Sequence, residues 1–166
     1  MKPEQVKVAV SLDNGGVVIM SVVTNDGNRV QVAPGTAYID SLITQSASHT
    51  GGWEGLPVSW RQVTDSEIAA LDRYFRGAWV DSGGLTINMP KARLIHLLRI
   101  REARRPKFLL LDAEYLRAHE QGDTVLMQQV AAQKQALRDL PTTYAPTLEA
   151  AATPAQLKAI WPSELA

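Results

Sequence analysis

The amino-acid sequence predicts an α+β fold, with a small N-terminal antiparallel β-sheet and a short helix, followed by a long kinked helical hairpin and a short C-terminal helix. Two observations support this prediction. Segments rich in β-branched residues alternate with Asn/Asp-Gly turns over residues 6–32. Apolar residues at three-to-four-residue spacing occupy 89–139, with a Gly-Asp corner at 122–123. The change in pattern predicts an N-terminal α+β domain at 1–88 and a C-terminal helical hairpin region at 89–166.

The N-terminal sheet is expected to begin with a β-hairpin. Residues 6–12 and 17–23 are separated by an Asp-Asn-Gly-Gly turn at 13–16, whose composition suits positive backbone angles. A second turn leads to residues 30–32, which can add a third strand. Residues 36–46 carry apolar side chains at helical spacing. One short helix is therefore expected to pack on the sheet.

The rest of this domain has weaker signals. Residues 46–57 are polar and rich in glycine, which predicts a loop. Residues 58–63 are predicted as a strand. Thr64 and Glu67 have the spacing of a capping box, so a short helix is expected to follow Thr64. Residues 85–88 are predicted as the last strand before the hairpin.

The hairpin region is predicted to start with a long amphipathic helix. Pro90 is tolerated in the first turn, because its missing N–H would have no intrahelical partner there. Apolar residues then recur at helical spacing, which predicts that one face is buried. The first of them are Leu94, Ile95, Leu97, Leu98 and Ile100. Pro106 either ends this helix near Arg105 or kinks a single long one, and we favour the kink.

The chain is expected to reverse direction over very few residues. Gly122 can take the left-handed conformation that closes a helix, and Asp123 can cap the next helix. Pro141 and Pro146 are expected to break the regularity of the returning helix. Thr153-Pro154 then opens a final short helix.

The composition is that of an ordinary globular chain. Of its 166 residues, 45% are apolar and 20% are charged. No apolar run approaches the roughly 20 residues that cross a bilayer, so no membrane partner is expected. The N-terminus lacks the apolar core of a secretory signal. The absence of cysteine excludes disulfides and thiolate sites, and fits synthesis in the cytosol.

The net charge of zero hides an asymmetry. Residues 91–107 contain seven basic residues and one acidic residue, a net charge of +6, and the rest of the chain carries −6. The basic helix face is therefore expected to meet an anionic partner, the acidic remainder of its own chain, or a neighbouring copy. Arg93, Arg101, Arg104 and Arg105 share part of one face and are the candidate partner-binding residues.

Two uses of this basic face are compatible with the sequence. A protein partner or a structural role is favoured, because the opposite stripe must be buried. Nucleic acid is the less favoured partner, since the aromatic-interleaved basic patches that bind single strands are missing. Trp53, in its polar glycine-rich segment, is an additional candidate for partner contact, because tryptophan often dominates binding energy at interfaces.

Motifs of catalysis are missing from the sequence. It contains no phosphate-binding loop, no dinucleotide fingerprint, no Gly-x-Ser-x-Gly elbow and no His-Glu-x-x-His. His49, His96 and His119 lie on three separate elements, which is unlike a metal site. We therefore expect no enzymatic activity, no metal and no cofactor.

Several blocks of the second half resemble a known family. They are MPKAR at 89–93, Pro-Lys at 106–107, Gly-Asp at 122–123, KQALRD at 134–139, and Trp-Pro at 161–162. Over residues 73–166 the chain resembles small bacteriophage proteins grouped with the phage tail assembly chaperones, which are associated with tail fibres. This resemblance implies a tail protein without catalysis.

The resemblance and the residues together predict a non-enzymatic tail protein that binds the tail fibre or its attachment region. Its expected partners are tail-fibre or baseplate proteins, and a homo-oligomer is left open. It would act as an assembly chaperone in the host cytoplasm or as an adaptor that stays in the virion tail. The alternative is a nucleic-acid-binding regulator that uses the basic helix at 91–107.

Overall fold

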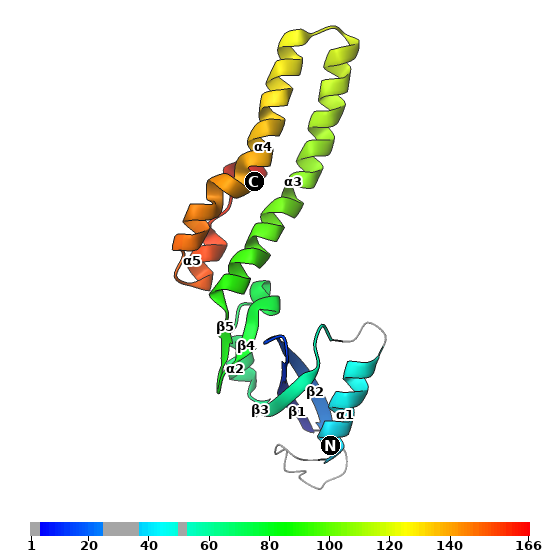
Figure 1. Ribbon diagram of the computed structural model, residues 1–166, viewed down its shortest axis with the longest axis vertical. Coiled ribbons are helices and arrows are strands. Elements are labelled where there is room, and N and C mark those ends of the chain that lie inside the picture. The colour runs from blue at the N-terminus through cyan, green and yellow to red at the C-terminus, as the bar shows by residue number, and fades with distance from the viewer. Residues whose placement is uncertain (1–3, 25–36, 50–52) are drawn as a thin grey trace. The chain divides into compact units, whose positions relative to one another are not determined.

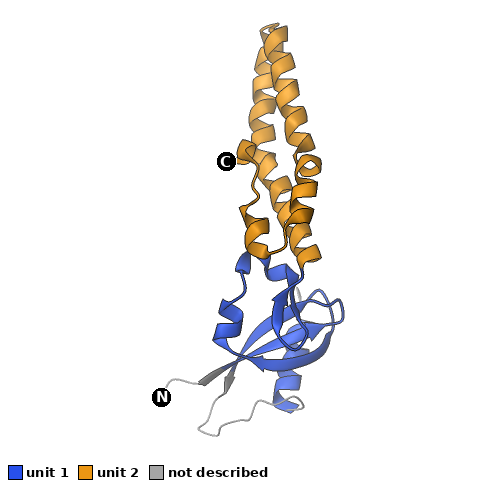
Figure 2. Ribbon diagram, turned by 90° about the vertical axis from the view of Figure 1, so that its left-hand side faces the viewer, with its two compact units in different colours: residues 1–88 blue, residues 89–166 orange. Residues whose placement is uncertain are grey.

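The computed structural model describes residues 4–24, 37–49 and 53–166. The chain divides into two compact units, Met1–Asn88 and Met89–Ala166, which are coloured separately in Figure 2 and are described here one at a time. The first unit combines a three-stranded antiparallel sheet with a short helix, and the second is a long helical hairpin with a short helix after it. The predicted α+β fold is therefore confirmed.

The sheet of unit 1 is built from β1 (Glu4–Leu12), β2 (Val17–Thr24) and β3 (Pro57–Val63), in the order β2-β1-β3. Gly15 has a φ of 72°, as the predicted hairpin turn requires. The strand predicted at 30–32 lies outside the described residues. β3 pairs with the edge of β1 that β2 leaves open, so β1 is the central strand of this sheet.

One face of this sheet packs against helix α1, Ala37–Ser48 (Figure 1). Alternate residues of a strand point to the same face, and Val8, Val10 and Val22 are almost fully buried. Ile39 and Ile43, four residues apart on α1, pack against them. These residues form the main hydrophobic core of unit 1.

Four short elements follow the sheet. They are α2 (Asp65–Ala69), the 3-10 helix η1 (Arg73–Ala78), β4 (Trp79–Asp81) and β5 (Leu85–Ile87). β4 pairs with β5, and the turn between them contains Gly83 at a φ of 84°. β5 lies within the strand predicted at 85–88, whereas β4 was not predicted from the sequence. Phe75, Ala78 and Trp79 are buried and anchor this part of the unit.

An ion network links β3 to α2 and β4. The Arg61 guanidinium donates from Nε to Asp81 Oδ2 at 2.7 Å and from Nη1 to Glu67 Oε1 at 2.9 Å. The hydrogen bond to Asp81 raises the pKa of Arg61. Glu67 also accepts the backbone N–H of Thr64 in the predicted capping box, which the structure confirms. This bond and Arg61 lower the pKa of Glu67.

The lowered pKa of Glu67 predicts an acid-dependent loss of stability. A carboxylate with a lowered folded-state pKa stabilises the fold above its ordinary pKa of 4.5, and that contribution disappears as the pH falls through the folded-state value. The melting temperature of Glu67→Gln should therefore lie below that of the wild type at pH 7. Thermal unfolding from pH 7 to pH 3 should show this difference shrinking below pH 4.5. A difference in melting temperature that stays constant with pH would contradict the link between the pKa of Glu67 and stability. Glu120→Gln, a substitution at an exposed residue of unit 2, removes the same charge and serves as the control.

Unit 2 is dominated by two long helices that lie side by side in Figure 1, α3 (Met89–Glu120) and α4 (Thr124–Ala150). α3 continues through Pro106, so of the two alternatives for this proline the end of the helix near Arg105 is wrong. The predicted corner is confirmed: Gly122 has a φ of 67°, and the Asp123 side chain accepts the N–H of Leu126.

The prediction that prolines break the returning helix is wrong. α4 includes both Pro141 and Pro146. A proline has no N–H for the carbonyl four residues before it, so Pro141 leaves the Leu137 carbonyl without its helical donor. Arg104 of α3 supplies that donor at 2.8 Å. A neighbouring helix thus provides the bond that the local sequence lacks.

The chain then folds back against α3. α5 (Pro154–Ala159) begins with the capping box of Thr153 and Gln156, and the short η2 (Ser163–Leu165) follows. His96 of α3 is fully buried, and its Nε2 lies 2.7 Å from the Ile160 carbonyl oxygen. Its ring meets the Trp161 ring edge to face, with 5.8 Å between the ring centroids. The fully buried Leu157 completes this contact region.

Candidate protein-binding surface

Helix α3 has an inner face that packs and an outer face that does not. The inner face buries Ala92, His96, Ile100 and Ala118. On the outer face, six residues follow one another at spacings of three, four and seven, which places them on one side of the helix. We call them the outer stripe: Leu94, Leu98, Arg101, Arg105, Leu109 and Leu116.

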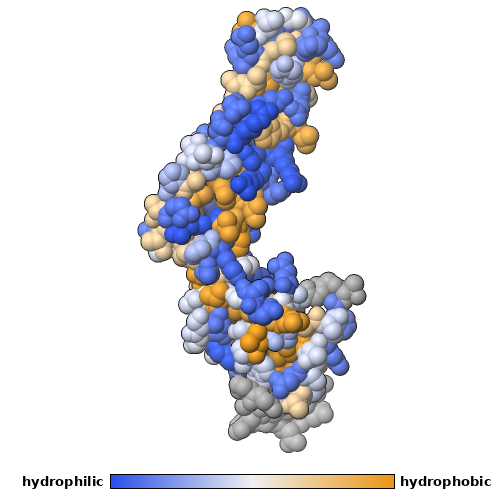
Figure 3. Space-filling view, in the orientation of Figure 1, coloured by the Kyte–Doolittle hydropathy of each residue, from blue (hydrophilic) through white to orange (hydrophobic). Residues whose placement is uncertain are grey.

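The four leucines of the outer stripe are between 54% and 71% exposed. The expectation that Leu94 and Leu98 are buried is therefore wrong, although Ile100 is buried as predicted. Residues 94–100 are apolar on most sides of the helix, so the spacing alone does not choose the buried face. Figure 3 shows apolar surface interspersed with strongly hydrophilic surface along the hairpin. Exposed apolar side chains that gather on one face with polar neighbours are a feature of protein interaction sites.

Arg104 does not lie on this surface. Its Nη1 donates to the carbonyls of Leu137 and Arg138 at 2.8 and 3.1 Å, and its Nε is buried without a partner among the described residues. Burial lowers the pKa of Arg104, and the neighbouring charge of Arg101 adds to the shift. Arg104 therefore holds α4 against α3.

Arg93 is used in the same way at the C-terminal end of α4. Its Nε and Nη2 donate to the carbonyls of Leu148 and Ala151 at 3.1 and 3.0 Å, and its Nη1 lies 3.4 Å from Glu149. The last carbonyls of a helix lack intrahelical donors, so Arg93 caps them. Its side chain is 22% exposed. Arg93 is therefore also a structural residue.

Arg101 and Arg105 remain available for a partner. Both are exposed on the outer stripe. Arg105 forms an exposed ion pair with Glu102, one turn away at 3.2 Å, and such pairs contribute little to stability. No described residue forms an ion pair with Arg101. Of the four arginines predicted to act together, Arg101 and Arg105 are exposed, whereas Arg93 and Arg104 are partly buried and donate to backbone carbonyls of α4.

Trp53 lies in unit 1, where it packs against the core formed by α1 and the sheet. It is partly buried and lines a shallow hollow beside the β1–β2 turn. The other residues of this hollow are Asp13, Asn14, Ala47, Glu54, Gly55 and Leu56. The Asp13 carboxylate already accepts the backbone N–H of Leu56 at 3.0 Å. The polar groups of this hollow therefore support the loop itself.

Neither a metal site nor a membrane span is found in the described part of the chain. Within it, no three histidine, aspartate or glutamate side chains gather closely enough to hold a metal ion. Over the same residues, no helix has both the length and the apolar character of a membrane span.

The fold and the outer stripe define a small α+β protein that presents one face of a helical hairpin. Comparison of the chain with protein-family models, curated proteins and solved structures found no match.

Proposed function

We propose that this chain is a non-enzymatic bacteriophage tail protein that binds the tail fibre or its attachment region and supports fibre assembly or attachment. The observation that carries the proposal is the outer stripe, which presents four exposed leucines and two exposed arginines on one face of α3. The bacteriophage context rests on the resemblance of residues 73–166. The partner that suits this stripe is a protein surface with apolar patches and carboxylates.

The alternative of a nucleic-acid-binding regulator is less well supported. A groove-binding helix needs several arginines or lysines free to reach phosphates. Arg93 and Arg104 are committed to carbonyls of α4, which reduces the charge that the basic run can offer. The four leucines of the outer stripe would have no apolar partner on a phosphate backbone. A protein partner makes use of both kinds of side chain.

Mass spectrometry of purified phage particles tests the proposal and separates its two roles. A virion adaptor should be present in a fixed, symmetry-compatible ratio to a known tail subunit. An assembly chaperone should be absent from finished particles and should co-purify with fibre protein when the two are co-expressed. A chain that is absent from particles, fails to bind fibre or baseplate proteins, and binds DNA with steep salt dependence would replace the proposal with the regulator.

A further inference from the structure

The second face of the sheet in unit 1 carries a basic hollow that the proposed function does not use. Lys7 lies opposite Ser21 in the register of β1 and β2, and Ile19 lies opposite Ala9. η1 and β4 stand over this face. The hollow has a volume of about 230 Å³, and we call it the basic pocket. Its lining residues are Lys7, Ile19, Ser21, Ile68, Arg73, Arg76 and Trp79.

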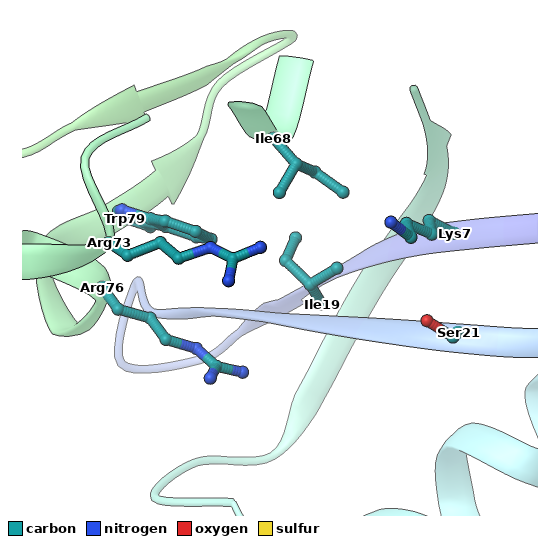
Figure 4. Close-up of a pocket in the computed structure, with 7 residues that line it drawn as sticks. All are labelled: Lys7, Ile19, Ser21, Ile68, Arg73, Arg76 and Trp79. Carbon is teal, nitrogen blue, oxygen red and sulfur yellow. The ribbon is translucent and has the colours of Figure 1, made fainter. Parts of the chain in front are cut away.

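Two cationic groups of the basic pocket approach each other over Ile19. Figure 4 shows the ends of Arg73 and Lys7 pointing toward each other from opposite sides of Ile19, with the Trp79 ring alongside Arg73. Arg73 and Arg76 are exposed residues of η1, and both line the hollow. No ion pair of either arginine is formed with a described residue.

One carboxylate already uses the edge of this pocket. Asp65 of α2 pairs with the Lys7 amino group, and its side chain is 81% exposed. Three cations and this single carboxylate leave the basic pocket with a net positive charge. Trp79 is only 3% exposed, and its indole Nε1 donates to the Asp72 carbonyl at 3.3 Å, so the floor is held in place.

We propose that the basic pocket binds the C-terminal carboxylate of a peptide whose last residue is apolar. Guanidinium groups match the planar carboxylate with paired N–H donors. Ile19, Ile68 and Trp79 provide apolar contact for the carbon atoms beside it. The volume lies below the roughly 300–1,000 Å³ of pockets that enclose drug-sized ligands, so the pocket fits one residue of a chain better than a nucleotide.

The experiment uses the full-length chain and a pair of small probes, N-acetyl-L-leucine and its uncharged amide. Binding is followed by the NMR signal of the Trp79 indole N–H. The carboxylate should bind with a Kd of about 1 mM, as its small size implies, and the amide at least about tenfold more weakly. Equal shifts of the Trp79 indole signal with both probes would overturn the proposal. So would the absence of any shift at a probe concentration of roughly ten times the expected Kd.

Substitutions then locate the site. Arg73→Gln together with Arg76→Gln should weaken carboxylate binding by more than about tenfold, whereas Arg117→Gln, an exposed arginine of unit 2, should leave it unchanged. Asp65→Asn removes the competing carboxylate and should strengthen binding several-fold, a gain that an unfolded variant cannot produce. Unchanged binding in the double variant, or tighter binding of inorganic phosphate than of the probe, would reject a carboxylate site. The outcome is independent of the outer stripe, which lies in unit 2.

Discussion

If the chain binds the tail fibre as proposed, Arg101→Glu combined with Arg105→Glu should weaken its binding to the tail-fibre protein of its own phage by about 100-fold. Each reversal replaces an attraction to carboxylates by a repulsion, and at interfaces such changes commonly cost a factor of about ten each. Both side chains are exposed, so the fold should be unaffected. Isothermal titration of purified fibre protein measures the effect, and added salt should reduce it.

The matched control changes the same net charge elsewhere on the hairpin. Arg117→Glu with Arg138→Glu lies outside the outer stripe and should leave fibre affinity within about threefold of the wild type. Leu98→Ser with Leu109→Ser tests the apolar half of the stripe. It should weaken binding with only a small fall in the melting temperature, because both leucines are more than half exposed and the remaining loss is mainly the poorer helix propensity of serine. Equal loss in the charge control would mean that overall charge, rather than the outer stripe, governs binding.

The elements that local chemistry determines were predictable from the sequence. The turn at 13–16, the capping box of Thr64 and the corner at Gly122 each depend on neighbouring residues, and each is present in the structure. The partner of β1 in the sheet was not predictable in this way. β3 reaches it from about fifty residues along the chain, and pairing at that range depends on the whole unit.

The candidate site was only partly predictable from the sequence. The number of basic residues in a segment does not show which arginines bind carbonyls within the hairpin and which are exposed to a partner. A signal did exist for Arg104. Pro141 implies a carbonyl at Leu137 that needs a donor, and an arginine on the adjacent helix can supply one. The exposed leucines were harder to find, since Leu94 and Leu98 share their apolar character with the buried Ile100. Which side of α3 faces α4 is a property of tertiary packing.

This account of Arg104 predicts a large and specific effect on stability. Arg104→Met keeps an unbranched side chain but removes the donor, and should lower the free energy of unfolding by about 1–3 kcal/mol, since a buried carbonyl loses its hydrogen bond. Arg117→Met, an exposed substitution on the same helix, should change it by less than about 0.5 kcal/mol. Urea unfolding followed by circular dichroism measures both values.

Pro141→Ala provides the decisive comparison, because alanine restores the N–H that the Leu137 carbonyl lacks. In that background the helix supplies its own bond, so Arg104→Met should cost at least about 1 kcal/mol less than it does in the wild type. The effect of Pro141→Ala on the unfolded chain is common to both backgrounds and cancels in the double-mutant cycle. If Arg104→Met costs the same with proline or alanine at 141, Arg104 does not compensate for the missing N–H of Pro141, and it stabilises the hairpin through packing and its bond to the Arg138 carbonyl. A coupling of the expected size would show that the arginine on α3 allows a proline within α4.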